Sequence, residues 1–324
     1  MRTKRIKVDG NVAVYHCIGR IVGGAMLLGD DEKEVFRRLM WRVAEFCGME
    51  IVTYCLMSNH VHLLVRAPAK VELSDEQLCQ RMLKYYGRRE TWVQLIADEF
   101  RERGELPKDI RQRLLAQMGD VSMFMRTLKQ RFSKWYNQKH KRFGTLWAER
   151  FKSVLVEDAS ESLRTVAMYI DLNPVRAGLV EDPKDYRFCG HAEAMGGNKS
   201  IRAEITSLFE VRNWRSVAGE YRSAMMVYAG DPGGAGKVAL SREQILKVLQ
   251  KGGRLEPAEV LRLRLRYLTD GAVFGSKQFV NEVFEEFRDR FGRKRKSGAR
   301  ALHQIGDRLG DTFALRDVRK DAVR

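Results

Sequence analysis

The sequence lacks the features of a secreted, disulfide-bonded or membrane-spanning protein. Its five cysteines are odd in number and form no C-x-x-C pair, which argues against a disulfide framework and against a zinc knuckle. No apolar run approaches the roughly 18 residues that a membrane span requires. No apolar segment follows the basic residues 1–5 as it would in a signal peptide. We therefore expect a cytoplasmic protein that does not enter a membrane.

Acidic residues are too few to balance the basic ones. The 324 residues include 59 Lys and Arg against 42 Asp and Glu, which gives a formal net charge of +17. A protein this basic most often binds a polyanion, and nucleic acid is the leading candidate, with an anionic membrane surface as the lesser one.

A phosphate-binding loop at Gly236-Lys237 is excluded, because Asp231 and Val238 stand where glycine and Ser/Thr are needed.

Hydrophobic periodicity predicts an α+β fold. Strands are expected at 13–22, 49–57, 60–67 and 150–157, and helices at 30–46, 121–140 and 161–172. With further helices before the fourth strand, this order is a split βαβ arrangement, which predicts a ferredoxin-like antiparallel sheet.

The chain is expected to divide into three parts. Residues 1–195 form the main domain, with an inserted helical subdomain at about 74–118. Residues 196–240, rich in glycine toward their end, are predicted to be a linker region. Residues 241–324 are predicted to form a small, basic helical extension with helices at 241–251, 257–268 and 276–291. We expect this extension to bind DNA and to be separable from the chemistry, because all candidate site residues precede it.

The strand at 60–67 carries two histidines on one face. Side chains alternate along a strand, so His60 and His62 point the same way, roughly 7 Å apart, while Val61 and Leu63 point into a core. Two adjacent imidazoles can share a metal ion. The alternative is a pair of polar residues on an exposed strand face.

A second candidate group lies in the helix at 161–172. Tyr169 and Asn173 are four residues apart and so share a helix face. The Asn173 carbonyl oxygen suits Mg²⁺ or Mn²⁺, and the Tyr169 hydroxyl can attack phosphorus. The alternative is a core tyrosine and a helix terminator. Tyr136 is a weaker nucleophile candidate, because Asn137 follows it directly and faces another way.

Several motifs together resemble one family. The segment His60-Val61-His62 resembles the histidine-hydrophobic-histidine motif of the HUH endonucleases. The segment 169–178 (YIDLNPVRAG) resembles the tyrosine segment of the REP-associated tyrosine transposases, relatives of the single-tyrosine insertion-sequence transposases. Residues 56–65 (LMSNHVHLLV), 144–147 (GTLW) and 150–153 (RFKS) also match that family, and the resemblance covers about residues 1–190.

The resemblance implies metal-dependent cleavage and rejoining of single-stranded DNA near hairpins. His60, His62 and Asn173 would hold one Mg²⁺ or Mn²⁺ ion, and Tyr169 would form a 5′-phosphotyrosine bond. The candidates for DNA contact are the basic residues Arg5, Lys129, Arg131 and Arg150.

Other functions stay open at this point. A non-catalytic DNA-binding regulator of a repeated element could keep the same fold, and rolling-circle initiators and relaxases share the histidine pair. The Asn-Pro-Val-Arg context at 173–176 differs from the usual tyrosine segment of those enzymes. A plain metallohydrolase is a more distant alternative, and both a monomer and a homodimer fit the sequence.

Overall fold

The computed structural model describes residues 5–8, 10–69, 72–87, 89–210, 213–226, 266–291, 295–302 and 312–315. Its strands are β1 (Ala13–Arg20), β2 (Glu50–Leu56), β3 (His60–Ala67), β4 (Lys152–Val156), β5 (Val273–Ser276), β6 (Arg300–Ala301) and β7 (Thr312–Ala314). The first helices are α1 (Asp30–Cys47), α2 (Asp75–Tyr86), α3 (Thr91–Arg103), α4 (Lys108–Leu115) and α5 (Val121–Lys139). They are followed by α6 (Ser160–Asp171), α7 (Asn173–Arg176), α8 (Gly190–Met195), α9 (Lys199–Ser207), α10 (Trp214–Met226), α13 (Arg266–Asp270) and α14 (Lys277–Glu286). Short 3₁₀ turns occur at Val22–Gly24, Pro183–Asp185 and Arg288–Arg290.

One sheet runs through the molecule in the order β2-β3-β1-β4-β5-β7-β6. Its first four strands, β2-β3-β1-β4, are antiparallel to their neighbours. This is the strand order of a split βαβ unit, so the predicted α+β, ferredoxin-like arrangement is confirmed. No helix among the described residues is long and apolar enough to cross a membrane, and all five cysteines are buried free thiols.

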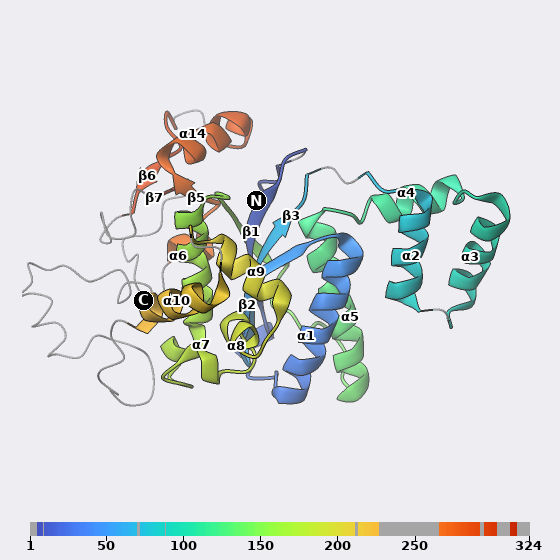
Figure 1. Ribbon diagram of the computed structural model, residues 1–324, viewed down its shortest axis with the longest axis horizontal. Helices are drawn as coiled ribbons and strands as arrows, with labels where there is room; N and C mark the ends of the chain where they lie inside the picture. Colours follow the sequence, from blue (N-terminus) through green and yellow to red (C-terminus); the bar gives the residue numbers. More distant parts are fainter. Residues whose placement is uncertain are drawn as a thin grey trace, which may run out of the picture.

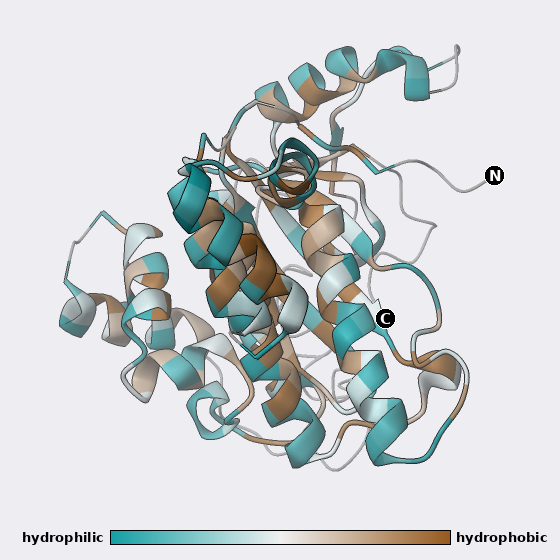
Figure 2. Ribbon diagram, turned by 90° about the vertical axis from the view of Figure 1, so that its right-hand side faces the viewer, coloured by the Kyte–Doolittle hydropathy of each residue, from teal (hydrophilic) through white to brown (hydrophobic). Residues whose placement is uncertain are grey.

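Helices cover both faces of the sheet (Figure 1). On one face α1 and α5 pack together, where the rings of Phe36 and Phe132 lie 5.0 Å apart and Trp147 lies against both. On the other face α6 packs over β2 and β3. Figure 2 shows the hydrophilic residues on the outer sides of the helices and hydrophobic residues toward the middle of the molecule. Most residues of β1 and β3 are therefore buried whichever face they point to.

The insertion predicted at 74–118 is helical, as α2, α3 and α4, and extends away from the sheet (Figure 1). Its base is attached to the main domain through aromatic contacts. The Tyr85 ring stacks on Phe46 of α1 at 4.1 Å, and the Arg131 guanidinium of α5 lies 4.2 Å from the Tyr85 ring centroid.

The prediction of a linker at 196–240 is wrong for about the first thirty residues, because 199–207 and 214–226 form helices α9 and α10. Asn198 caps α9 by accepting a hydrogen bond from the Ile201 N–H at 3.1 Å, and the buried side chains of Ile201 and Ile205 hold the helix against the domain. Residues 227–240 lie outside the described part of the chain.

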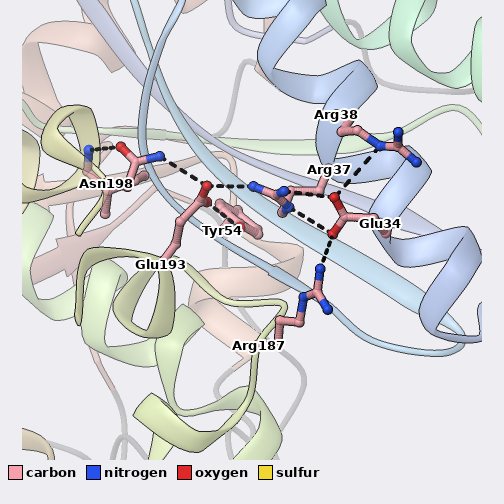
Figure 3. A network of polar contacts seen from close by, with 8 residues as sticks. Glu34, Arg37, Arg38, Tyr54, Arg187, Glu193 and Asn198 are labelled. Atoms are coloured by element: carbon pink, nitrogen blue, oxygen red, sulfur yellow. Dashed lines mark hydrogen bonds and ion pairs between the residues drawn. The ribbon is translucent and has the colours of Figure 1, made fainter. Parts of the chain in front are cut away.

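Polar contacts hold this region against β2 (Figure 3). The Glu193 carboxylate of α8 accepts hydrogen bonds from Arg37 of α1 at 2.7 Å, from Tyr54 of β2 and from Asn198 at 3.0 Å. The Leu56 N–H donates to the Phe188 carbonyl at 2.9 Å. Residues 187–207 therefore cover the outer edge of the sheet.

The C-terminal extension joins the same sheet, which differs from the separable helical unit predicted from the sequence. β5 pairs with β4 in parallel, with Val273 beside Leu155, and β7 and β6 continue the sheet. The buried pair Val273 and Phe274 explains this strand, because two consecutive apolar residues are buried on both faces of a central strand. The predicted helix at 276–291 is confirmed over 277–286, whereas 241–251 and most of 257–268 lie outside the described residues.

A buried carboxylate fastens α6 to the sheet. Asp171 accepts hydrogen bonds from Thr53 Oγ1 at 2.8 Å, from the Tyr221 hydroxyl at 2.7 Å and from the His191 N–H at 3.2 Å. Thr53 faces α6 because a β-bulge between Ile51 and Thr53 changes the register of β2. Burial raises the pKa of the Asp171 carboxyl to about 6, although its three donors act to lower the pKa.

Gly190→Ala is expected to destabilise the domain by about 1–3 kcal/mol, the usual cost of overpacking. A Cβ at this position would lie 2.1 Å from Thr53 Oγ1 and 3.1 Å from Thr53 Cα, so α8 would be pushed off β2. Urea denaturation measures the change. The matched control is Gly219→Ala in α10, where a Cβ meets nothing within 4 Å and stability should rise by up to about 1 kcal/mol. Equal effects of the two substitutions would contradict this packing.

Asp171→Asn should change the pH dependence of stability. The native carboxyl, with a pKa of about 6, keeps a proton that the unfolded chain releases near its ordinary value of 3.8, so this carboxyl lowers stability as pH rises from 4 to 6. An asparagine has no such proton. The free energy of unfolding of Asp171→Asn relative to wild type should therefore increase by about 2 kcal/mol between pH 4 and pH 7. Glu161→Ala, at an exposed position of the same helix, should show no such trend, and parallel curves for Asp171→Asn and wild type would refute it.

Candidate active site

The histidine pair lies where the sequence predicts it, at the start of β3. His60 is opposite Arg20 of β1, and His62 is opposite Ile18 of β1 and Cys55 of β2. The two rings are edge to face with centroids 5.0 Å apart. His62 is buried, with 4% of its surface exposed, and the intervening Val61 is fully buried on the opposite face. The predicted alternation of the strand is therefore confirmed.

Neighbouring groups fix the tautomer of His60. The His60 Nδ1 atom lies 2.6 Å from Asn59 Oδ1, and Asn59 Nδ2 donates to the Gly24 carbonyl at 3.3 Å. Because the amide oxygen only accepts, the Nδ1 atom of His60 carries the proton. The basic nitrogen of a neutral His60 is therefore Nε2.

A third histidine, His16 of β1, supports His62 on the same face of the sheet. The His16 Nε2 atom lies 2.8 Å from His62 Nδ1, and His16 Nδ1 lies 2.7 Å from the carbonyl oxygen of Leu268 in α13. Burial lowers the pKa of His16 to about 4. Burial, and then the neighbouring His16 and His60, also lower the pKa of His62. Both imidazoles are therefore neutral at pH 7, as metal-binding histidines must be.

The candidate nucleophile lies beside these histidines. The Tyr169 ring of α6 is 6.3 Å from the His16 ring and 6.4 Å from the His62 ring, centroid to centroid. The guanidinium of Arg176 lies 4.0 Å from the centroid of the Tyr169 ring and also donates a hydrogen bond to the Tyr169 carbonyl at 2.5 Å. Tyr169 is buried, with 2% of its surface exposed. The two parts of the predicted constellation, 107 positions apart in the chain from His62 to Tyr169, thus come together in the fold.

The competing tyrosine lies elsewhere. Tyr136 is on α5, the helix that packs with α1 on the opposite face of the sheet, where its ring stacks on His140 at 4.2 Å and its hydroxyl donates to the Leu27 carbonyl at 3.4 Å. The geometry therefore favours Tyr169.

Asn173 begins α7, one turn beyond Tyr169. Its Nδ2 atom donates to the carbonyl oxygens of Ile170 at 3.0 Å and Tyr169 at 3.4 Å. These bonds hold the side chain against the end of α6, and they use the amide nitrogen rather than Oδ1. The oxygen that would serve as a hard ligand is therefore the atom that these bonds leave available.

The donor set fits a divalent ion. An imidazole binds a metal ion through the electron pair of a ring nitrogen, and an amide oxygen is a suitable third donor for Mg²⁺ or Mn²⁺. Within the described residues no group of three His, Cys, Asp or Glu side chains could hold a metal ion. His16 does not make the third donor, because both of its ring nitrogens are already hydrogen bonded.

The four basic residues predicted to contact DNA differ in their surroundings. Lys129 is buried, donates to the Glu149 carbonyl at 2.8 Å, and its burial lowers its pKa to about 8. Arg5 lies over the Phe151 ring and donates to the Phe151 carbonyl at 2.6 Å, and Arg131 lies over Tyr85. These three make structural contacts inside the domain. Arg150 is exposed.

Sequence reasoning missed two residues of this site. His16 had a signal, since it is a lone histidine in an otherwise apolar strand. Asp171 also had a sequence signal, because it is a charged residue between the apolar Ile170 and Leu172, which are both buried. The Leu268 carbonyl has no sequence signal, because every residue carries one.

Comparison with known proteins gives one family match. Residues 11–89 match the family model described as "Transposase IS200 like". This segment contains His16, His60 and His62 and ends before Tyr169. No curated protein matches the chain. A solved structure of a REP-associated tyrosine transposase bound to a REP hairpin is similar at 15% identity with a TM-score of 0.41, and the match covers 74% of this chain and 99% of that chain. The segment that carries the three histidines is thus similar to the IS200-like transposases, which confirms the resemblance to tyrosine transposases predicted from the sequence motifs.

Proposed function

We propose that the protein is a divalent-metal-dependent transposase that cleaves and rejoins single-stranded DNA through Tyr169. One observation carries the proposal. The Tyr169 ring lies 6.4 Å from that of His62, and both His60 and His62 are held with Nδ1 toward a hydrogen-bond partner. This arrangement supports a site in which Tyr169 attacks phosphorus and the two histidines bind the metal ion on the same face of the sheet. The IS200-like segment at 11–89 supports the same class of reaction.

The residues that would hold the ion are His60 and His62 through Nε2 and Asn173 through Oδ1. When bound, Mg²⁺ or Mn²⁺ supplies Lewis-acid stabilisation of the negative charge that develops on the scissile phosphate. The protein positions this set on rigid elements, since β3 lies inside the sheet and α6 is fastened by Asp171. Such rigidity matters because the contribution of proximity depends on near-attack geometry.

The proposed reaction is a transesterification, in which one phosphodiester bond is exchanged for another. The Tyr169 oxygen forms a bond to phosphorus, the bond from phosphorus to the 3′-oxygen breaks, and the tyrosine proton is given up as the 3′-hydroxyl forms. The product is a 5′-phosphotyrosine and a free 3′-hydroxyl. Rejoining reverses these steps with another 3′-hydroxyl and needs no external energy source, because one phosphodiester is exchanged for another.

The substrate is expected to be single-stranded or hairpin DNA in the cytoplasm. The net charge of +17 supports binding to a polyanion. Arg176 beside Tyr169 and the exposed Arg150 are the cations we propose for phosphate contact. A catalytically silent regulator of a repeated element would use the same surface and is separated from the enzyme by the two experiments below.

Tyr169→Phe should fold normally and lose all covalent chemistry, because the substitution keeps the ring under Arg176 and removes only the attacking oxygen. The assay incubates the protein with end-labelled hairpin DNA carrying single-stranded flanks and with Mn²⁺, then separates covalent adducts on a denaturing protein gel. Wild type should carry label, and so should the control Tyr136→Phe, which alters a buried tyrosine on the far face. An adduct on Tyr169→Phe would move the nucleophile elsewhere, and no adduct on wild type would favour the regulator.

His60→Ala and His62→Ala should each abolish cleavage, as should EDTA added to wild type. DNA binding, measured by fluorescence anisotropy, should change by no more than about threefold, because affinity comes mainly from phosphate contacts. The control is His140→Ala, since His140 lies at the end of α5 and contacts Glu32 at 3.0 Å. Cleavage that persists in excess chelator would show that the metal assignment is wrong.

A further inference from the structure

The C-terminal segment reaches the candidate site through the backbone carbonyl of Leu268. Residues 266–276 run beside β1 and β4, where the Leu155 N–H donates to the Ala272 carbonyl at 2.9 Å and Lys152 pairs with Asp270 at 2.8 Å. These contacts hold α13 so that the Leu268 carbonyl oxygen lies 2.7 Å from His16 Nδ1. Leu268 itself is buried. The carbonyl is therefore a fixed part of the surroundings of the histidines.

Two hydrogen bonds in series determine where the protons lie. A carbonyl oxygen only accepts, so His16 Nδ1 must donate to Leu268. A fully buried, neutral His16 then has only an electron pair at Nε2. Because His16 Nε2 lies 2.8 Å from His62 Nδ1, His62 must donate from Nδ1, and its own electron pair is on Nε2. The order of donation is His62 to His16 to Leu268.

We propose that His16 and the Leu268 carbonyl set the metal-binding tautomer of His62, which makes His16 a positioning residue and the C-terminal segment a part of the active site. This inference rests on the proposed function, because it assigns a purpose to the Nε2 atom of His62. Groups that orient a metal-binding histidine in this way typically change metal affinity by 10- to 100-fold when removed.

His16 is suited to support and not to direct ligation. Its two nitrogens face Leu268 and His62, so binding an ion would break one of these buried hydrogen bonds. The ring also packs against its neighbour, with its centroid 5.0 Å from that of His62 and an interplanar angle of 27°. His16 thus fixes both the proton and the orientation of His62.

Two amide substitutions at position 16 separate this role from simple packing. His16→Gln places its amide near the position of Nε2, and so keeps an acceptor for His62. His16→Asn places its amide near the position of Nδ1, and so keeps a partner for Leu268 but leaves His62 without an acceptor. The control is His191→Asn, since His191 is equally buried and its ring nitrogens have no hydrogen-bond partner among the described residues. Thermal unfolding checks that each full-length variant is folded.

The first readout is the tautomer of His62 in metal-free protein, from the nitrogen-15 shifts of its ring. Wild type, His16→Gln and His191→Asn should show Nδ1–H. His16→Asn should show a mixture of both tautomers. If His62 stays Nδ1–H in His16→Asn, the proposal is overturned, whatever the protein does with DNA.

The second readout is Mn²⁺ affinity, from titration calorimetry of the full chain without DNA. His16→Asn should bind Mn²⁺ at least about 10-fold more weakly than wild type, and His16→Gln should stay within about threefold of it. Equal losses in both variants would mean that His16 only fills space. A wild type that shows the Nδ1–H tautomer and binds no Mn²⁺ would refute the metal site of the proposed function, while a wild type that binds Mn²⁺ with His62 in the other tautomer would refute the inference alone.

Discussion

The antiparallel register between β1 and β3 is the constraint on which the site depends. With His60 opposite Arg20 and His62 opposite Ile18, the side chains of His16, His60 and His62 all project toward α6. A shift by one residue would turn every side chain of β3 to the other face, and would bring Val61 and Leu63 under α6. Val61 and Leu63 oppose such a shift, because both are fully buried on the face of the sheet that α1 and α5 cover. The packing of one face therefore determines the chemistry of the other.

The position of α6 depends on a second constraint, the buried carboxylate of Asp171, which costs stability. The buried Asp171 carboxylate is held by two hydroxyl groups and one backbone N–H, yet its raised pKa shows that these bonds do not fully compensate for burial. An apolar residue here would be less costly to bury and would leave α6 free to slide on β2. The carboxylate instead ties Tyr169 to one axial position through Thr53, Tyr221 and the backbone of α8. Burial of Asp171 therefore lowers the stability of the domain and in return fixes the position of Tyr169.

Local pattern predicted the elements of this protein well, and its long-range contacts less well. The strand at 60–67 and the helix at 161–172 follow from periodicity, and so did the expectation that His60 and His62 share a face. That His16 contacts His62 depends on which strands pair across 46 positions, and strand pairing is a tertiary property. The helices in 199–226 were missed because their polar faces and neighbouring glycines are typical of loops. The surroundings of Lys129 could not be foreseen either, because its aliphatic stem is buried and its ammonium group lies 4.8 Å from the centroid of the Trp147 ring.

The cover on β2 has a consequence for self-association. An unpaired edge strand offers N–H and C=O groups to a second sheet, which is a common route to dimers and aggregates. Here the Leu56 N–H donates to the Phe188 carbonyl, and the backbones of Cys55 and Cys189 form an isolated antiparallel β-bridge. The ion-pair network around Glu193 lies over the same edge. A second copy could not extend the sheet at this half of β2 without first displacing residues 187–193. A dimer of this protein would therefore not form by joining two sheets at this half of β2.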